Sequence, residues 1–180
     1  MVTITYFVHG TTTDNEQHLA TGWLPGELSE KGREQAKDLG NQAAGVTFDA
    51  VFCSDLERAI ESATLGFGDK YTIIQDGRLR EANYGDMNGK PHTFKDTMED
   101  FVDSPFPGGE SYRDTEKRLR DFCKFLKENY DGKHIAIVAH QAPQLALEVI
   151  LNDKTWDEAI VQDWRRTKAF QPGGWKYTVN

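Results

Sequence analysis

The sequence is poor in cysteine and has no long hydrophobic run. Its two cysteines, Cys53 and Cys123, stand 70 positions apart. They offer neither a disulfide framework nor a CxxC metal site, so we expect two buried apolar thiols. The longest aliphatic stretch, Ile135 to Ala139, is far shorter than the roughly 20 apolar residues that cross a bilayer. The sequence therefore predicts no membrane partner.

Targeting and metal-binding signals are also absent from the sequence. The first residues, MVTITYFVHG, contain no charged segment followed by an apolar one, and the chain has no Asn-x-Ser/Thr site. We therefore expect a cytoplasmic location. His18, His92 and His134 show no metal-ligand spacing with one another or with the cysteines, so no metal site is expected.

Positive charge is scarce as well. The chain has 21 lysines and arginines against 29 aspartates and glutamates, a net charge of -8 at pH 7. Such a surface repels the phosphates of nucleic acids, so we expect no nucleic-acid partner. A small anionic substrate is still compatible with this charge, provided that arginines or lysines gather locally around it.

The remaining pattern predicts one α/β domain over residues 1–180. Apolar runs predict strands at Val2–Val8, Phe48–Cys53, Tyr71–Gln75 and His134–Ala139. Helices are predicted from Ser29 to Gly40, after a Ser54-Asp55 cap, from Ser111 to Leu126, from Ala142 and from Thr155. Asp76 to Pro91 is expected to be a loop, and Arg166 to Val179 an edge strand or loop. Strands that alternate with helices favour a three-layer sandwich, with a mostly parallel central sheet and helices on both faces.

Several chemically active side chains directly follow the predicted strands. His9 and His140 each end a strand, and Arg58 lies one turn into the helix after the second strand. Ligands bind beyond the carboxyl ends of parallel strands, so we expect these residues to meet in one cleft. Backbone N–H groups at helix starts attract anions, and a guanidinium can hold phosphate or carboxylate with parallel hydrogen bonds.

A carboxylate completes this set. Glu81 lies in the glycine-bearing segment RLREANYGDMNG after the third strand. An imidazole that accepts a phosphoryl group, a carboxylic acid that protonates the leaving oxygen and cations around the phosphoryl oxygens make up a phosphoryl-transfer site. That chemistry requires neither a metal nor a cofactor, and none is expected.

Five motifs occur in a characteristic order: HGTTTDN, SDLERA, LREANYGDMNG, PGGES and VAHQ. With them the chain resembles the histidine phosphatase superfamily, also called the phosphoglycerate mutase-like family, over about residues 3–150. The resemblance implies that His9 is phosphorylated and that Glu81 is the proton donor. It further implies that Asn15, Arg58 and His140 contact the phosphoryl group, with Gly22 near the phosphate in a loop that helps close the pocket.

One position departs from the family pattern. The first motif of the family reads Arg-His-Gly, whereas this chain has Val8 before His9. Loss of one positioned donor costs on the order of 3 kcal/mol of transition-state stabilisation. A cation from elsewhere, such as Arg80, Arg113 or Lys168, takes its place, or the enzyme is slow, or the site binds phosphorylated ligands without turning them over.

Among these alternatives we favour an enzyme. The chain is compact, and LREANYGDMNG is more similar to the phosphatase form of that motif than to the mutase form. The resemblance thus implies a metal-independent phosphatase that acts through phosphohistidine on a small phosphorylated metabolite. A cofactor-dependent phosphoglycerate mutase and a catalytically weak phospho-ligand binding module are the alternatives. The sequence carries no signal for a particular substrate or oligomeric state.

Overall fold

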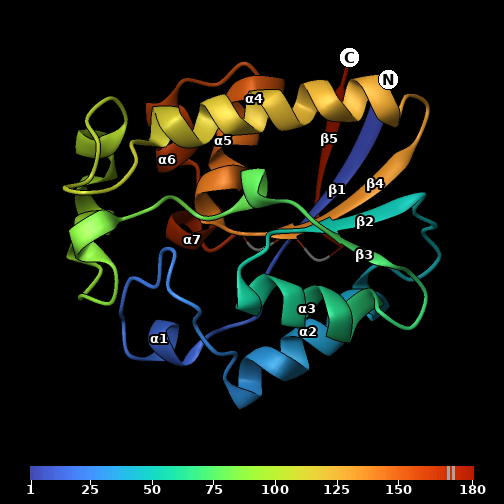
Figure 1. The fold of residues 1–180 in the computed structure, drawn as a ribbon, viewed down its shortest axis with the longest axis horizontal. Coiled ribbons are helices and arrows are strands. Elements are labelled where there is room, and N and C mark those ends of the chain that lie inside the picture. The colour runs from blue at the N-terminus through green and yellow to red at the C-terminus, as the bar shows by residue number, and fades with distance from the viewer. Residues whose placement is uncertain (170, 172) are drawn as a thin grey trace.

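A five-stranded sheet forms the centre of the molecule in the computed structural model, which describes residues 1–169, 171 and 173–180 (Figure 1). The strands lie in the order β3-β2-β4-β1-β5. Their bounds are Val2–Val8 (β1), Ala50–Cys53 (β2), Ile73–Gln75 (β3), His134–Ala139 (β4) and Trp175–Val179 (β5). All neighbouring strands are parallel except β5, which runs antiparallel to β1 at the edge.

Helices cover both faces of this sheet, as the alternation of strands and helices predicts (Figure 1). The helices α2 (Glu30–Gln42) and α3 (Glu57–Phe67) pack on one face, and α4 (Tyr112–Asn129), α5 (Gln141–Leu151) and α6 (Trp156–Val161) on the other. Strand β4 shows why both faces are apolar. Ile135 and Ile137 enter the cluster under α4 and α5, whereas Ala136 and Val138 enter the cluster under α2 and α3.

Side-chain caps start the longer helices where the sequence places them. Ser29 accepts a hydrogen bond from the Gly32 N–H, and Ser111 and Asp114 form a reciprocal capping box at the start of α4. Thr155 and Glu158 form the same box at α6. Both cysteines are free and buried, as expected.

Other expectations need correction. Ser54-Asp55 does not cap α3, because Leu56 is the cap residue. The Ser54 hydroxyl instead accepts a hydrogen bond from the Leu56 N–H. The Asp76 to Pro91 segment contains two short 3-10 turns, Gly77–Leu79 (η1) and Gly85–Met87 (η2).

Three further elements have no counterpart in the sequence pattern. They are α1 (Thr13–Glu16), the 3-10 segment η3 (Thr93–Phe101) and α7 (Trp164–Thr167). In the tail expected between Arg166 and Val179, β5 is the edge strand, and positions 170 and 172 lie outside the described residues. Single turns such as α1 and α7 are too short to produce a readable period, and η3 is interrupted by the non-helical backbone of Thr97.

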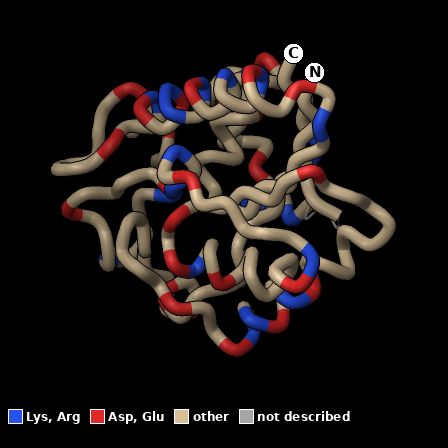
Figure 2. Tube along the Cα trace, turned by 45° about the vertical axis from the view of Figure 1, so that its right-hand side comes forward, with Lys and Arg blue, Asp and Glu red and all other residues tan. Residues whose placement is uncertain are grey.

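Charges of both signs are interspersed along the outer surface of α4 (Figure 2). Its inner face carries Leu119, Phe122 and Leu126, all fully buried. Within the described residues, no helix combines the length and apolar character needed to span a membrane.

Candidate active site

The register between β1 and β4 brings the two predicted histidines together. Val8 pairs with Ala139, and the His9 N–H donates to the Ala139 carbonyl at 3.0 Å. His9 and His140 are therefore the next residues on adjacent parallel strands, and their ring centroids lie 5.0 Å apart. The expected meeting of these side chains at the carboxyl edge of the sheet is confirmed.

The backbone fixes which ring nitrogen of His9 carries the proton. Nδ1 lies 2.6 Å from the Gly10 carbonyl oxygen, which only accepts, so Nδ1 is the protonated nitrogen and Nε2 keeps its lone pair. Burial, and then the positive charge of Arg58, lower the pKa of His9 to about 3. The imidazole is therefore neutral near pH 7 and has the form that a nucleophile needs.

His140 is fully buried at the start of α5. Its backbone N–H and carbonyl both bond to the Tyr6 hydroxyl, at 2.9 and 2.7 Å. Within the described part of the chain, neither ring nitrogen has a hydrogen-bond partner. Burial, followed by the charge of Arg58 and the neighbouring His9, lowers the pKa of His140 well below its usual range. A buried imidazole without a partner can bond to a bound ligand.

Glu81 reaches the same place from the loop after η1. Its carboxylate accepts the backbone N–H groups of Ala142 at 2.9 Å, Ala82 at 3.0 Å and Gln141 at 3.2 Å. The Glu81 carboxylate thus lies at the start of α5, the helix that begins directly after His140. Trp23 and Arg118, which no sequence motif singles out, donate to the Glu81 carbonyl at 2.7 and 3.0 Å. Because both anchors lie far away in the chain, no local sequence signal identifies them.

Arg58 is close enough to influence both histidines but is already engaged. The residue is only 2% exposed, and its guanidinium donates to the carbonyls of Gly22 at 2.8 Å and Leu24 at 3.1 Å. Gly22 has φ +52°, in the region that favours glycine, and an added Cβ would lie 1.8 Å from Asn88 Oδ1. Arg58 therefore holds the Gly22 loop against α3.

Asn15 lies in α1 at the edge of the site. Its Oδ1 accepts the Thr12 N–H at 3.1 Å, and the Thr12 hydroxyl accepts the Asn15 N–H in return. This capping box fixes the side chain and leaves the amide Nδ2 as its remaining donor.

A cavity of about 290 Å³ is lined by His9, Asn15 and Glu81, whereas His140, Arg58 and Gly22 are not among its lining residues. Besides Val8, His9, Asn15 and Glu81, its lining contains two cations that the sequence reasoning missed, Lys95 from η3 and Arg165 from α7. Both belong to elements without a readable period, which explains why they were not found. Thr11, His92, Gln141 and Trp164 complete the wall.

The cations proposed from the sequence to replace the motif arginine lie elsewhere. Arg80 forms two hydrogen bonds to Asp55, at 2.6 and 2.7 Å. Arg113 bonds to Asp103 and to Glu116 on the surface. Lys168 donates to the Arg165 carbonyl at 3.1 Å. Arg80, Arg113 and Lys168 do not line the cavity that contains His9 and Glu81.

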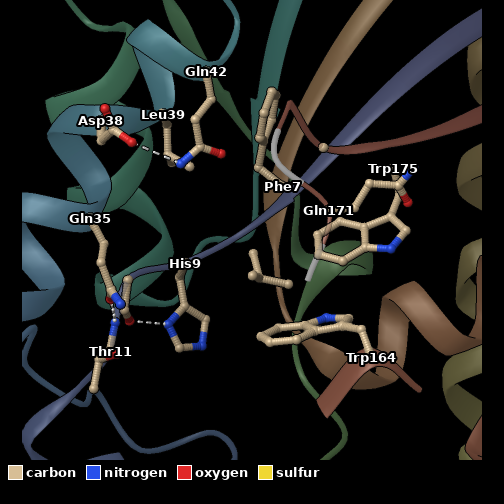
Figure 3. Close-up of a pocket in the computed structure, with 13 residues that line it drawn as sticks. Phe7, His9, Thr11, Gln35, Asp38, Leu39, Gln42, Trp164, Gln171 and Trp175 are labelled. Atoms are coloured by element: carbon tan, nitrogen blue, oxygen red, sulfur yellow. Dashed lines mark hydrogen bonds between the residues drawn. The ribbon is translucent and has the colours of Figure 1, made fainter. Parts of the chain in front are cut away.

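A second cavity of about 220 Å³ also borders His9 (Figure 3). Gln35, Asp38 and Gln42 border it from α2, and Trp164 and Trp175 from the opposite side. Val8, His9, Thr11 and Trp164 line both cavities.

The described residues contain no group of three or more His, Cys, Asp or Glu side chains arranged to hold a metal ion. The site thus consists of two neutral histidines, a carboxylate and several cations. Such a set is able to transfer a phosphoryl group through an imidazole.

Comparison with known proteins agrees with this chemistry. The family model of the histidine phosphatase superfamily (branch 1) matches residues 6–167. A 2,3-bisphosphoglycerate-dependent phosphoglycerate mutase of Parvibaculum lavamentivorans is 34% identical over 150 residues, which are 73% of this chain and 71% of the mutase.

Two solved phosphatases share the fold. The alpha-ribazole phosphatase from Shigella flexneri superposes with a TM-score of 0.77 at 27% identity, over 87% of this chain and 83% of that one. A mycobacterial glucosyl-3-phosphoglycerate phosphatase in complex with VO3 gives a TM-score of 0.78 at 27% identity, over 88% and 86%. These neighbours confirm the predicted fold class.

Proposed function

Because the chain belongs to the histidine phosphatase superfamily, we propose that it is a phosphomonoesterase that works through a phosphohistidine intermediate on His9. The observation that carries the proposal is the tautomer of His9, whose Nδ1–H is bonded to the Gly10 carbonyl. Its Nε2 is left as the nucleophile, beside His140 and at a cavity that Glu81 also lines.

The reaction has two steps. In the first, His9 Nε2 attacks phosphorus, so that a P–N bond forms while the P–O bond to the leaving group breaks. Glu81 enters this step as the carboxylic acid, gives its proton to the leaving oxygen and becomes the carboxylate, and the free alcohol departs. In the second step water attacks phosphorus and loses a proton to Glu81, the P–N bond breaks, and inorganic phosphate leaves with His9 restored.

The other predicted residues assist this transfer. His140 donates a hydrogen bond from its buried ring to a phosphoryl oxygen, and Asn15 does so from its amide. Arg58, near the start of α3, supplies positive charge and holds the Gly22 loop through its hydrogen bond to the Gly22 carbonyl. Val8 occupies the place of the motif arginine at the end of β1, and its apolar side chain borders the cavity.

The substrate is a small phosphorylated metabolite, because the cavity at His9 has a volume of about 290 Å³ and the net charge of -8 disfavours a large polyanionic partner. We propose that residues 1–180 form one domain that works in the cytoplasm, with neither a nucleic acid nor a membrane as partner and without a cofactor.

Phosphoglycerate mutase activity is the second candidate, since curated relatives such as the one from P. lavamentivorans carry that name. A mutase returns the phosphoryl group to the sugar acid, whereas a phosphatase passes it to water. Incubation with 3-phosphoglycerate and a trace of 2,3-bisphosphoglycerate separates the two. We expect release of inorganic phosphate, and accumulation of 2-phosphoglycerate without phosphate release would favour the mutase.

Turnover of a chromogenic phosphate monoester tests the proposal. The wild-type protein should hydrolyse it equally well with and without a chelator, His9→Ala should be inactive, and His134→Ala, a histidine at the opposite end of β4, should keep its activity. If neither wild type nor variant turns over while vanadate still binds, the chain is a phospho-ligand binding module instead.

A further inference from the structure

The cavity at His9 contains two cations that have no role in the chemistry above. Lys95 and Arg165 are the only lysine and arginine among its described lining residues. Both are among the positive charges that lower the pKa of His9, after burial and Arg58. They come from η3 and α7, two elements on separate parts of the chain.

Arg165 is held in place by the element that also positions His140 and Glu81. Its Nη1 donates to Asp163 Oδ1 at 3.0 Å and to Gln144 Oε1 at 3.3 Å. The other oxygen of the buried Asp163 accepts a hydrogen bond from Gln141 at the start of α5. In the described chain, Nε and Nη2 of Arg165 make no further hydrogen bond, so one edge of a fixed guanidinium is free for an anion.

Lys95 provides a second free cation. Its ammonium group has neither an ion pair nor a hydrogen bond within the described residues, although burial lowers its pKa. Its carbonyl accepts a hydrogen bond from Arg166 at 2.7 Å, which ties η3 to α7. A partly buried ammonium without a partner is costly unless a ligand compensates it.

We propose that Lys95 and Arg165 bind the phosphoryl group that is transferred to His9, and so provide the charge that Val8 cannot. This inference rests on the proposed function. Arg58 is not among the residues that line this cavity, and two of its five N–H groups already bond to backbone carbonyls. A guanidinium fixed by Asp163 and Gln144 needs little reorganisation when negative charge develops on the phosphoryl oxygens.

Inorganic vanadate, which mimics the phosphoryl group without a leaving group, provides the test. Its affinity is measured by calorimetry, and kcat and KM with a chromogenic monoester, for wild type, Lys95→Met, Arg165→Met and Arg165→Lys. Lys124→Met on the outer surface of α4 is the control for the loss of one charge. We expect each Met variant to bind vanadate at least tenfold more weakly and to lose at least tenfold in kcat/KM, with partial rescue in Arg165→Lys.

The outcomes separate this inference from the proposed function. If wild type hydrolyses the monoester but both Met variants bind vanadate as tightly as Lys124→Met, the inference is wrong and the cations serve another group of the substrate. Arg165→Met removes the ion pair of Asp163, so its folding is checked by circular dichroism. Lys95→Met removes an ammonium group that makes no hydrogen bond to a described residue, and this variant decides the question if Arg165→Met does not fold. Inactivity of wild type on every monoester, with vanadate bound through Lys95 and Arg165, would refute only the proposed function.

Discussion

At the scale of single residues, a single hydrogen bond sets the chemistry of His9. The Gly10 carbonyl holds the proton on Nδ1, and burial together with Arg58 keeps the ring neutral. The neutral state leaves the Nε2 lone pair available, with the His140 ring 5.0 Å away and Glu81 in the lining of the same cavity.

Nuclear magnetic resonance of ring nitrogens tests this state. In protein labelled with ¹⁵N-histidine at pH 7, His9 should show a protonated Nδ1 and an unprotonated Nε2, and it should stay neutral down to pH 5 because its pKa is lowered to about 3. The His9→Ala spectrum assigns the signals. A cationic ring at pH 6 would contradict the account.

The role of Glu81 predicts a dependence on the leaving group. Glu81→Gln keeps the size and cannot donate a carboxyl proton, so kcat/KM for an alkyl phosphate, which reports the transfer to His9 and not the later hydrolysis, should fall about 10²- to 10⁴-fold. A p-nitrophenyl ester, whose oxygen leaves without much protonation, should lose far less. Equal losses for both esters would exclude the proton-donor role.

At the scale of elements, the loop after β1 is tightly packed against the start of α2. A Cβ on Gly32 would lie 1.9 Å from the Thr11 carbonyl oxygen, and one on Gly10 2.2 Å from the Gly32 carbonyl oxygen. The Gly10 N–H also donates to Ser62 on α3 at 3.0 Å. The glycine that weakens α2 as a helix former is thus the one that lets α2 approach the His9 loop.

Gly32→Ala should therefore destabilise the protein even though alanine is the better helix former. Overpacking typically costs about 1–3 kcal/mol, and we expect a decrease of that size in the free energy of unfolding measured in urea. Gly77→Ala is the control, because its added Cβ would meet Asp55 at an ordinary 3.4 Å. An unchanged stability for Gly32→Ala would show that the loop moves away freely.

The helices and strands also show how much of the structure can be predicted from the sequence. Periodicity and caps predicted the long helices, since Ser111 and Thr155 act locally, and the rule for parallel strands predicted that His9 and His140 meet. The positions of Lys95 and Arg165 could not be predicted, because η3 and α7 are brought to the site by tertiary packing. The orientation of Arg58 depends on the carbonyls of a distant loop, for which no local pattern exists.

At the scale of the whole molecule, the two neutral histidines link stability to pH. In the folded chain, the pKa of each histidine lies below its usual range. The pKa of His9 is lowered to about 3. In the unfolded chain they titrate near pH 6.5, so the unfolded state binds more protons between about pH 6.5 and the folded pKa. Stability is therefore complete above pH 6.5 and declines as the pH falls below it.

Urea unfolding at pH 7, 5.5 and 4.5 measures this decline. Each histidine contributes up to about 1.4 kcal/mol per pH unit, so wild type should lose stability faster on acidification than His140→Gln, which lacks one of the two groups. Identical slopes for the two proteins would show that His140 is not kept neutral by the fold.

The most direct test of the central claim is the identification of the phosphorylated residue. The protein is mixed with a ³²P-labelled monoester, quenched in alkali within milliseconds and mapped by mass spectrometry. An acid-labile, alkali-stable phosphate on the peptide that contains His9, and its absence in His9→Ala, is the predicted result. Label on another residue, or undiminished turnover in His9→Ala, would contradict the account.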